Sequence, residues 1–150
     1  MKMCSENITI LVYGDMLLFE TINDLLSKLG FKTQYVISSK EYLIKIIKEY
    51  YSEKNTIDYA IILNPESIEE IYSYVEKAGL VITNNCIEDD NIVCIKDNDK
   101  TYVASILFSL LGIPIDELMK IVDREHRRIV LKAYTYLMYR VINNEVKRLV

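Results

Sequence analysis

The sequence predicts an α/β fold, with a three-layer, Rossmann-like arrangement and a mostly parallel sheet of about five or more strands. Short β-branched runs alternate along the chain with longer runs of helical spacing, which is the pattern of consecutive βαβ units. Two of the short runs, residues 59–63 and 80–83, are almost continuously apolar. Such runs are typical of parallel strands in a sheet that helices cover on both faces.

The sequence predicts five strands over the whole chain and two helices in its first half. The five strands expected over the whole chain lie at residues 8–13, 32–37, 59–63, 80–83 and 92–95. A first helix is expected over 17–29, with Gly30 as its stop and an inward face formed by Leu18, Ile22, Leu25, Leu26 and Leu29. A second helix is expected over about 40–54, with an inward face formed by Leu43, Ile44, Ile47 and Tyr51.

The third helix has the clearest start signals. Asn64 is expected as its N-cap and Pro65 as its first residue, with the charge of Glu66 favourable in the first turn. The helix is expected to stop at Gly79. Its buried stripe is formed by Ile68, Ile71, Tyr72 and Val75.

A polar loop, residues 96–100, follows the fifth strand and precedes an apolar helix expected over 101–111. Asp99 or Asp97 is expected to cap this helix, and Gly112 to close it. Pro114 then restarts the chain as helix, with one apolar stretch at 115–122 and another at 129–141.

The whole chain, residues 1–150, is expected to form one domain, because this length can bury one core and is short for two. Within it, residues 1–112 form a βα-alternating body. Residues 113–150 form a helical extension, which is expected to pack on that body because no linker composition separates the two.

Charge and composition narrow the class of protein. The net charge of −4 divides into +4 for residues 121–150 and −8 for the rest. Three cysteines without CxxC spacing favour reduced thiols in the cytoplasm over a disulfide framework. No signal peptide or membrane-length apolar run is expected, which predicts a cytoplasmic protein without membrane contact. Twelve tyrosines, no tryptophan and a single glutamine, Gln34, resemble thermophile composition.

The turn after the first strand lacks the glycines of a nucleotide-binding fold. A strand that leads into a helix points free N–H groups at the turn, where phosphates commonly bind. Here Gly14 is followed by Asp15, Met16 and Leu17. The acidic and bulky side chains should keep a pyrophosphate away, so no nucleotide cofactor is expected at this turn.

Polar residues at the ends of several predicted strands form the candidate ligand site. Asn64, Asn84 and Asn85 follow the third and fourth strands, and Gly14 and Asp15 follow the first. Ligands of open α/β sheets bind at this carboxyl edge, so these residues could line one crevice. Helix caps and turns account for the same residues without a ligand.

Arg124, Arg127 and Arg128 form the candidate partner-binding site. Their spacing places them on one side of a helix, with Lys132 one turn further and several tyrosines behind. They could pair with the acidic body of the chain, bind a partner protein or bind an anionic ligand such as coenzyme A. Nucleic acid is not expected as a partner because the chain is acidic overall.

No catalytic residue and no metal ligand set is expected. His126 is the only histidine and lies in a strongly charged run. The acidic residues near 88–90 and 97–99 lack the glycine and terminal glutamate of a calcium loop. Three scattered cysteines match no cluster pattern. The expected cofactor is therefore none.

Two segments resemble the gamma subunit, or gamma domain, of 2-oxoacid:ferredoxin oxidoreductases. Residues 58–84 resemble the middle of that family, where a strand with a short polar turn leads to a helix, a glycine and a second strand. Residues 101–119 resemble its late helix, with Ala104, Ser105 and Ser109 as small residues and Gly112 at the end. By order of elements the resemblance covers nearly the whole chain.

The resemblance implies a subunit that binds neither thiamine diphosphate nor iron–sulfur clusters, which other subunits or domains of the family mainly hold. The opening G-x-G-G-Q-G pattern of the family falls on residues 12–17, and only Gly14 matches it. The contact made by that loop should therefore be missing here.

The function expected from these observations is that of a non-catalytic accessory or assembly component, which resembles a degenerate gamma subunit. Its expected partners are a second copy of the chain or larger oxidoreductase subunits. The alternative is a stand-alone module that binds a small molecule in the strand-end crevice. An independent enzyme has the least support, because no nucleophile–base pair is visible.

Overall fold

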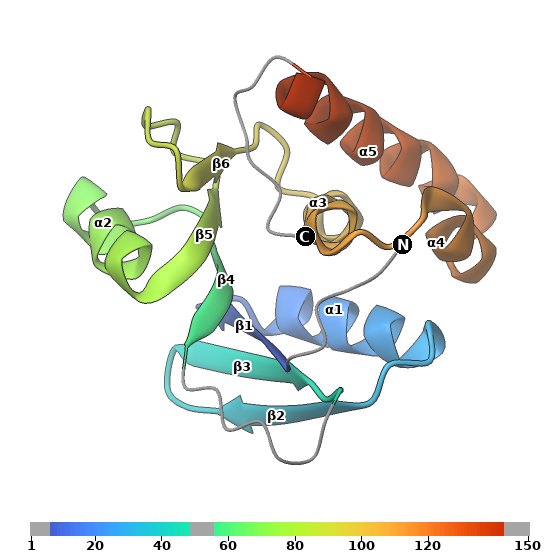
Figure 1. The fold of residues 1–150 in the computed structure, drawn as a ribbon, viewed down its shortest axis with the longest axis horizontal. Helices are drawn as coiled ribbons and strands as arrows, with labels where there is room; N and C mark the ends of the chain where they lie inside the picture. The colour runs from blue at the N-terminus through green and yellow to red at the C-terminus, as the bar shows by residue number, and fades with distance from the viewer. Residues whose placement is uncertain (1–6, 49–55, 143–150) are drawn as a thin grey trace.

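The computed structural model describes residues 7–48 and 56–142, and its centre is a mixed β-sheet (Figure 1). The sheet has six strands in the order β2-β3-β1-β4-β5-β6. Strand β3 is antiparallel to both of its neighbours, whereas β1, β4, β5 and β6 are parallel. The strands are β1 Ile8–Tyr13, β2 Thr33–Ile37, β3 Glu41–Ile46, β4 Ile57–Ile62, β5 Ala78–Thr83 and β6 Ile92–Cys94.

Helices lie on both faces of the sheet. Figure 1 shows α2 on one face, α1 and α3 on the other, and α5 packed outside α3. The predicted α/β class with a mostly parallel sheet is confirmed. The helices are α1 Met16–Lys28, α2 Ile68–Lys77, α3 Lys100–Leu111, α4 Ile115–Ile121 and α5 Arg127–Ile142, with a short 3-10 helix at Arg124–His126.

The helix predicted over 40–54 is wrong for its described part, because Glu41–Ile46 is strand β3. Ile44 and Ile46 are buried on the α1 side of the sheet, and Leu43 packs against the core cluster on the other side. The run thus has a period of two. It also predicts a helix because Leu43, Ile44 and Ile47 fit the helical spacing i, i+1, i+4. Residues 49–54 of that prediction lie outside the described part.

The start predicted for the third helix is also corrected. Ser67, not Asn64, is the N-cap of α2, and its hydroxyl accepts a hydrogen bond from the Glu70 N–H at 3.3 Å. Asn64 instead has a φ of 54°, in the left-handed region, and therefore belongs to a turn before the helix. The helix ends at Lys77, and Gly79 lies within β5, because the chain passes directly from helix to strand. The expected buried stripe is wrong for Ile68 and Tyr72, which are exposed, because α2 buries Ile71 and Tyr74.

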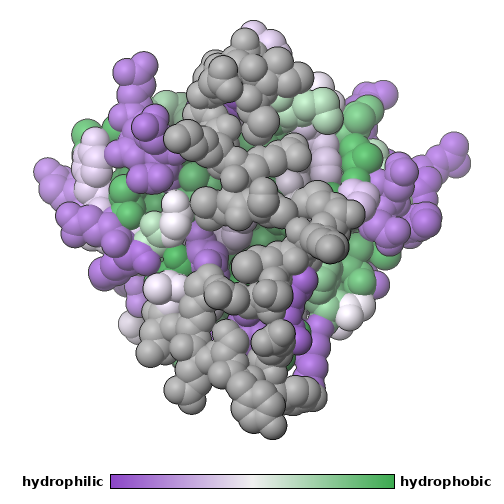
Figure 2. All heavy atoms as spheres, in the orientation of Figure 1, coloured by the Kyte–Doolittle hydropathy of each residue, from purple (hydrophilic) through white to green (hydrophobic). Residues whose placement is uncertain are grey.

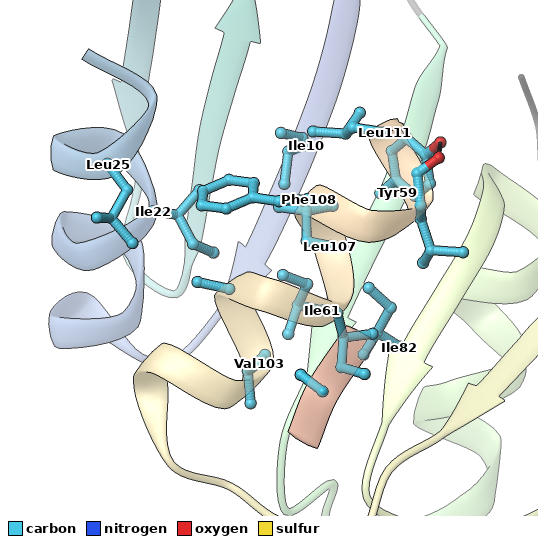
Figure 3. Packing of buried hydrophobic residues seen from close by; sticks show 14 of the residues in the cluster. Ile10, Ile22, Leu25, Tyr59, Ile61, Ile82, Val103, Leu107, Phe108 and Leu111 are labelled. Carbon is cyan, nitrogen blue, oxygen red and sulfur yellow. Dashed lines mark hydrogen bonds between the residues drawn. The ribbon is translucent and has the colours of Figure 1, made fainter. Parts of the chain in front are cut away.

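Helix α3 lies between α5 and the layer of α1 and the sheet (Figure 1), and its Val103, Leu107 and Phe108 point into the core (Figure 3). Every residue from Tyr102 to Leu111 is buried, because the sheet and α1 cover one side of α3 and α5 covers the other. The predicted ends are confirmed. The Asp99 side chain accepts a hydrogen bond from the Tyr102 N–H at 3.1 Å, and Gly112 closes the helix with a φ of 81°.

The last helix uses one side to cover α3. Val130, Ala133 and Leu137 are fully buried in the main core. At the ends of this contact, the Tyr134 hydroxyl donates to the Ile113 carbonyl at 2.8 Å, and Lys132 pairs with Asp97 at 3.3 Å. The helices predicted at 115–122 and 129–141 are thus confirmed, and Lys132 pairs with the acidic body of the chain.

The expectation of reduced thiols is wrong for two of the three cysteines, because Cys86 and Cys94 form a disulfide. Their Cα atoms are 5.1 Å apart, although eight positions separate them in the sequence. Cys94 pairs in register with Thr83 at the end of β5, so parallel pairing returns the chain to the neighbourhood of Cys86. Spacing alone did not reveal this proximity, and Cys4 lies outside the described residues.

Among the described residues, no helix is both long enough and apolar enough to cross a bilayer. The face in Figure 2 carries hydrophilic residues along both flanks, with hydrophobic residues exposed among them. Such mixing is ordinary for a protein surface, so the informative features are particular groups of exposed apolar side chains.

Tyr59 gives a prediction about alkaline stability. Burial, together with the nearby charge of Asp58, raises the pKa of Tyr59 to about 12. Because the folded-state pKa lies above the unfolded value, the contribution of Tyr59 is fully present below pH 10 and is lost between about pH 10 and 12. We expect Tyr59→Phe to have little effect at pH 7, where the hydroxyl bond to Leu110 is long at 3.4 Å.

At pH 11 the loss of stability should be about 1 kcal/mol smaller in Tyr59→Phe than in the wild type. Urea unfolding of both proteins at pH 7, 9 and 11 measures this difference. Parallel declines from pH 9 to 11 would contradict the assignment, and Tyr139→Phe, an exposed tyrosine, is the matched control.

Candidate functional site

The predicted strand-end site lies where β1, β4 and β5 finish side by side. Tyr13 pairs with Ile62, and Ile62 pairs with Thr83, so the three strands end at the same level. The residues that follow these strands are therefore neighbours, as their positions in the sequence predict.

The asparagines after β4 and β5 form a reciprocal pair. The Asn64 backbone N–H donates to Asn84 Oδ1 at 2.8 Å, and Asn84 Nδ2 donates to Asn64 Oδ1 at 2.8 Å. Asn64 is exposed and Asn84 is half-buried. The two side chains thus connect the ends of the neighbouring strands, and both side-chain oxygens already accept hydrogen bonds.

The turn after β1 is held by its own polar groups. Gly14 has a φ of 68°, which favours glycine, and its N–H donates to the Lys40 carbonyl at 2.7 Å. The Asp15 side chain accepts a hydrogen bond from the Leu18 N–H at 2.9 Å and caps α1. The carboxylate therefore sits where a phosphate would bind in a nucleotide-binding turn. Met16 and Leu17 follow it, and Leu17 is 61% exposed.

Asn85 belongs to a different part of the edge. Its N–H donates to the Thr83 hydroxyl at 3.3 Å, in a turn that leads directly to the disulfide at Cys86. The five predicted residues therefore divide into a capped turn at Gly14 and Asp15, the asparagine pair, and the start of the β5–β6 connection.

Sequence reasoning missed a tyrosine–carboxylate pair at the same edge. Because β3 is antiparallel to β1, Glu41 lies opposite Tyr13. The Tyr74 hydroxyl donates to Glu41 Oε2 at 2.5 Å, and the Tyr13 and Tyr74 rings lie 5.6 Å apart. The alternation of residues 41–46 could have revealed this strand, whereas its placement beside β1 depends on long-range pairing.

Burial raises the pKa of Tyr74 strongly, and the hydrogen bond to Glu41 adds to the shift. The charges of Glu41, Tyr13 and Glu70 act in the same direction. Among the described residues, Glu70 Oε1 is one of the buried side-chain oxygens without a hydrogen-bond partner. The phenol therefore stays protonated and acts as a fixed donor, which is a structural role that joins α2 to β3 and not that of a base.

A cavity of about 990 Å³ adjoins the β5–β6 connection. The connection carries three consecutive acidic residues, Glu88, Asp89 and Asp90, and Arg140 of α5 contributes the opposite side of the lining. Arg140 donates to the Cys94 carbonyl at 2.7 Å and to the Tyr136 hydroxyl at 3.2 Å. The cavity is therefore polar and is held between the connection and α5.

The outer side of α5 carries exposed apolar residues, which we call the α5 outer face. It consists of Leu131, Met138 and Tyr139, which are 54%, 54% and 65% exposed. In a helix Tyr139 lies opposite the buried Val130, whereas Leu131 and Met138 lie together on one flank, about 100° around the axis from Val130 and Leu137.

The predicted arginines lie at the N-terminal end of this helix. Arg124 is in the 3-10 helix, Arg127 and Arg128 begin α5, and all three are exposed. Arg127 Nε also donates to the Met119 carbonyl at 3.1 Å. Tyr139 is one of the tyrosines that the sequence places behind these arginines, whereas the exposure of Leu131 and Met138 depends on how α5 packs on α3.

Three side chains near these arginines bring possible metal-ligand atoms within 4.8 Å of one another, namely Asp123, Glu125 and His126. Both carboxylates are exposed, and His126 lies 3.8 Å from Asp123 as an ordinary local pair. Exposed acidic groups commonly cluster in this way without an ion, so these residues do not identify a metal site.

Comparisons with protein-family models and with curated proteins give no match to this chain.

Proposed function

We propose that the protein is a non-catalytic accessory or assembly component, which docks onto a larger subunit through the α5 outer face. The observation that carries the proposal is the group of Leu131, Met138 and Tyr139, which are exposed on a helix that buries Val130, Ala133 and Leu137 in the main core. The partner we infer is a subunit of a 2-oxoacid:ferredoxin oxidoreductase, because the sequence resembles a diverged gamma subunit.

The chemistry of this surface fits a protein partner. Interfaces are enriched in methionine, aromatic residues and arginine, and their apolar centres have polar rims. Here Leu131, Met138 and Tyr139 would form the centre, and Arg127 and Arg128 the basic rim. A matching partner surface is apolar with acidic residues at one end.

The sheet and its first turn support a role without catalysis. The parallel order β1-β4-β5-β6 is compatible with one half of a Rossmann-like sheet, and we propose a Rossmann-like classification on this basis. Asp15 occupies the helix N-terminus at which such folds bind phosphate. A scaffold that has kept the layers but not this phosphate site suits an accessory subunit.

A stand-alone binding module is the second candidate. It is favoured by the polar cavity of about 990 Å³ beside Asn85, at the carboxyl edge of the sheet. Both candidates are compatible with a cytoplasmic protein, which stays a prediction. In that compartment the Cys86–Cys94 bond would meet a reducing thiol pool.

The docking proposal is tested on protein purified from its native cells with an affinity tag. We expect it to elute as a complex with thiamine-diphosphate and iron–sulfur subunits that oxidises a 2-oxoacid. The double variant Leu131→Glu/Met138→Glu should lower recovery of these subunits at least about tenfold, because it places two charges at the centre of the interface. Arg127→Glu/Arg128→Glu should lower recovery less and mainly at low salt.

The matched control is Ile68→Glu/Tyr72→Glu, which introduces the same charges at exposed apolar positions of α2. Recovery equal to that of the wild type is expected for this control. A monomer that brings down no oxidoreductase subunit would contradict the proposal and favour the binding module. A homodimer that the α5 variants dissociate would assign the same face to self-association.

A further inference from the structure

We propose that Cys86 and Cys94 form a reversible dithiol–disulfide switch, which a dithiol reductant opens and which controls the conformation of residues 84–92. The inference is independent of docking through α5. The inference rests on the position of the disulfide, on its accessibility and on the other contacts that hold β6 in place.

The disulfide joins the two ends of the β5–β6 connection. Cys86 lies three residues after the end of β5, and Cys94 is the last residue of β6. Cys94 pairs in register with Thr83, so the bond crosses from the start of the connection to the neighbouring strand. Everything between the two cysteines is thereby held in a closed loop.

Strand β6 is held in place by other contacts as well. The Val81 N–H donates to the Asn91 carbonyl at 2.8 Å, and the Ile95 N–H donates to the Thr83 carbonyl at 2.9 Å. The Tyr136 hydroxyl and Arg140 each donate to the Cys94 carbonyl at 2.7 Å. Since a cross-link stabilises a short loop less than a long one, breaking this bond should release the connection and leave the fold intact.

The bond is accessible to a thiol in solution. Cys86 is exposed, Cys94 is half-buried, and both line the cavity of about 990 Å³. Thiol–disulfide exchange requires that a thiolate reach one of the two sulfurs, and exposed disulfides are the labile ones. Cys86 is the more exposed of the two residues, so its Sγ is the site of attack in the proposed exchange.

Electrostatic repulsion favours movement of the β5–β6 connection once the disulfide is broken. Glu88, Asp89 and Asp90 are adjacent, and their like charges favour an expanded loop. Asp89 makes local hydrogen bonds to the Asn91 and Ile92 N–H groups at 2.8 and 3.2 Å. The disulfide is the link that opposes this repulsion at the Cys86 end.

The exchange proceeds in two steps with a dithiol as the reductant. One thiolate of the reductant attacks Cys86 Sγ, the bond to Cys94 breaks, and Cys94 leaves as a thiolate that takes up a proton. The second thiolate of the reductant then attacks the mixed disulfide and releases Cys86 as a thiolate, which is also protonated. The protein gains two electrons and two protons, and the reductant becomes a disulfide.

The test uses the full chain, purified in air and treated with dithiothreitol without denaturant. Alkylation followed by mass spectrometry should find Cys86 and Cys94 unlabelled before treatment and both labelled after it. Hydrogen exchange of residues 84–92 should become at least about tenfold faster on reduction, with no change in residues 57–62, and should return when the protein is reoxidised.

Two variants separate the effect of the Cys86–Cys94 bond from that of Cys4. Cys86→Ser/Cys94→Ser should show the fast exchange of residues 84–92 without any reductant, and Cys4→Ser should behave as the wild type. The proposal is overturned if no disulfide forms in air, if reduction requires denaturant, or if exchange of residues 84–92 is unchanged. Unfolding of the double variant or of the reduced protein would also overturn it, because the bond would then be a structural cross-link.

Discussion

Replacing Phe108 by alanine should lower the free energy of unfolding by about 3–5 kcal/mol, the largest effect expected of a single substitution here. Phe108 is fully buried in α3, and Figure 3 shows its ring between α1 and the sheet, directed toward Ile22. Truncation removes the ring from the main core and leaves a cavity lined by residues of several elements. These residues are held by secondary structure and can close the space only partly.

Urea denaturation at pH 7 measures this loss, provided that both proteins unfold in one cooperative transition. Leu131→Ala is the control, because this leucine is exposed and should change stability by no more than about 0.5 kcal/mol. A loss below about 1.5 kcal/mol for Phe108→Ala would mean that α3 is not the packed centre of the molecule.

The elements that the sequence predicts correctly are those with a long, regular apolar pattern. The sequences of helices α1, α3 and α5 each contain an apolar stripe or a long apolar run that predicts a helix. Strands β1, β4 and β5 are short β-branched runs between turns. Asp99 and Gly112 are local signals, so the ends of α3 are readable without knowledge of the fold.

Strand β3 could not be recognised in the same way. Its six residues are too few to distinguish a period of two from helical spacing, and the turn before it, Ser38–Lys40, contains no glycine or asparagine. What makes it a strand is pairing on both sides, with β1 and with β2. That pairing is tertiary, and it also brings Glu41 to the site.

The candidate site was predictable only as a set of positions. Parallel strands end together, which places Asn64 beside Asn84 and Gly14 near them. The contacts made by these side chains depend on exact geometry that spacing does not contain. The same holds for Cys86 and Cys94, whose closeness follows from the register of β5 and β6.

The hydrogen bond between Tyr74 and Glu41 should make Tyr74→Phe the second most destabilising of these substitutions, by about 1.5–3 kcal/mol at pH 7. Tyr74 is 6% exposed, and its hydroxyl lies 2.5 Å from Glu41 Oε2. Loss of the hydroxyl leaves the half-buried carboxylate without this donor. Glu41→Gln should cost less, about 1 kcal/mol, because the amide oxygen still accepts the hydrogen bond.

A double-mutant cycle with Tyr74→Phe and Glu41→Ala, a change that removes the acceptor, isolates the interaction energy between the two side chains from the separate effect of each substitution. A coupling energy near zero would show that the two groups do not stabilise each other. The pH dependence gives a second check. Because the pKa of Tyr74 is raised above its ordinary value of 10, the advantage of the wild type over Tyr74→Phe should be complete below pH 10 and should shrink as the pH rises further. An advantage that grew above pH 10 would mean that the phenol ionises more easily in the folded protein, and that Glu41 is not its acceptor.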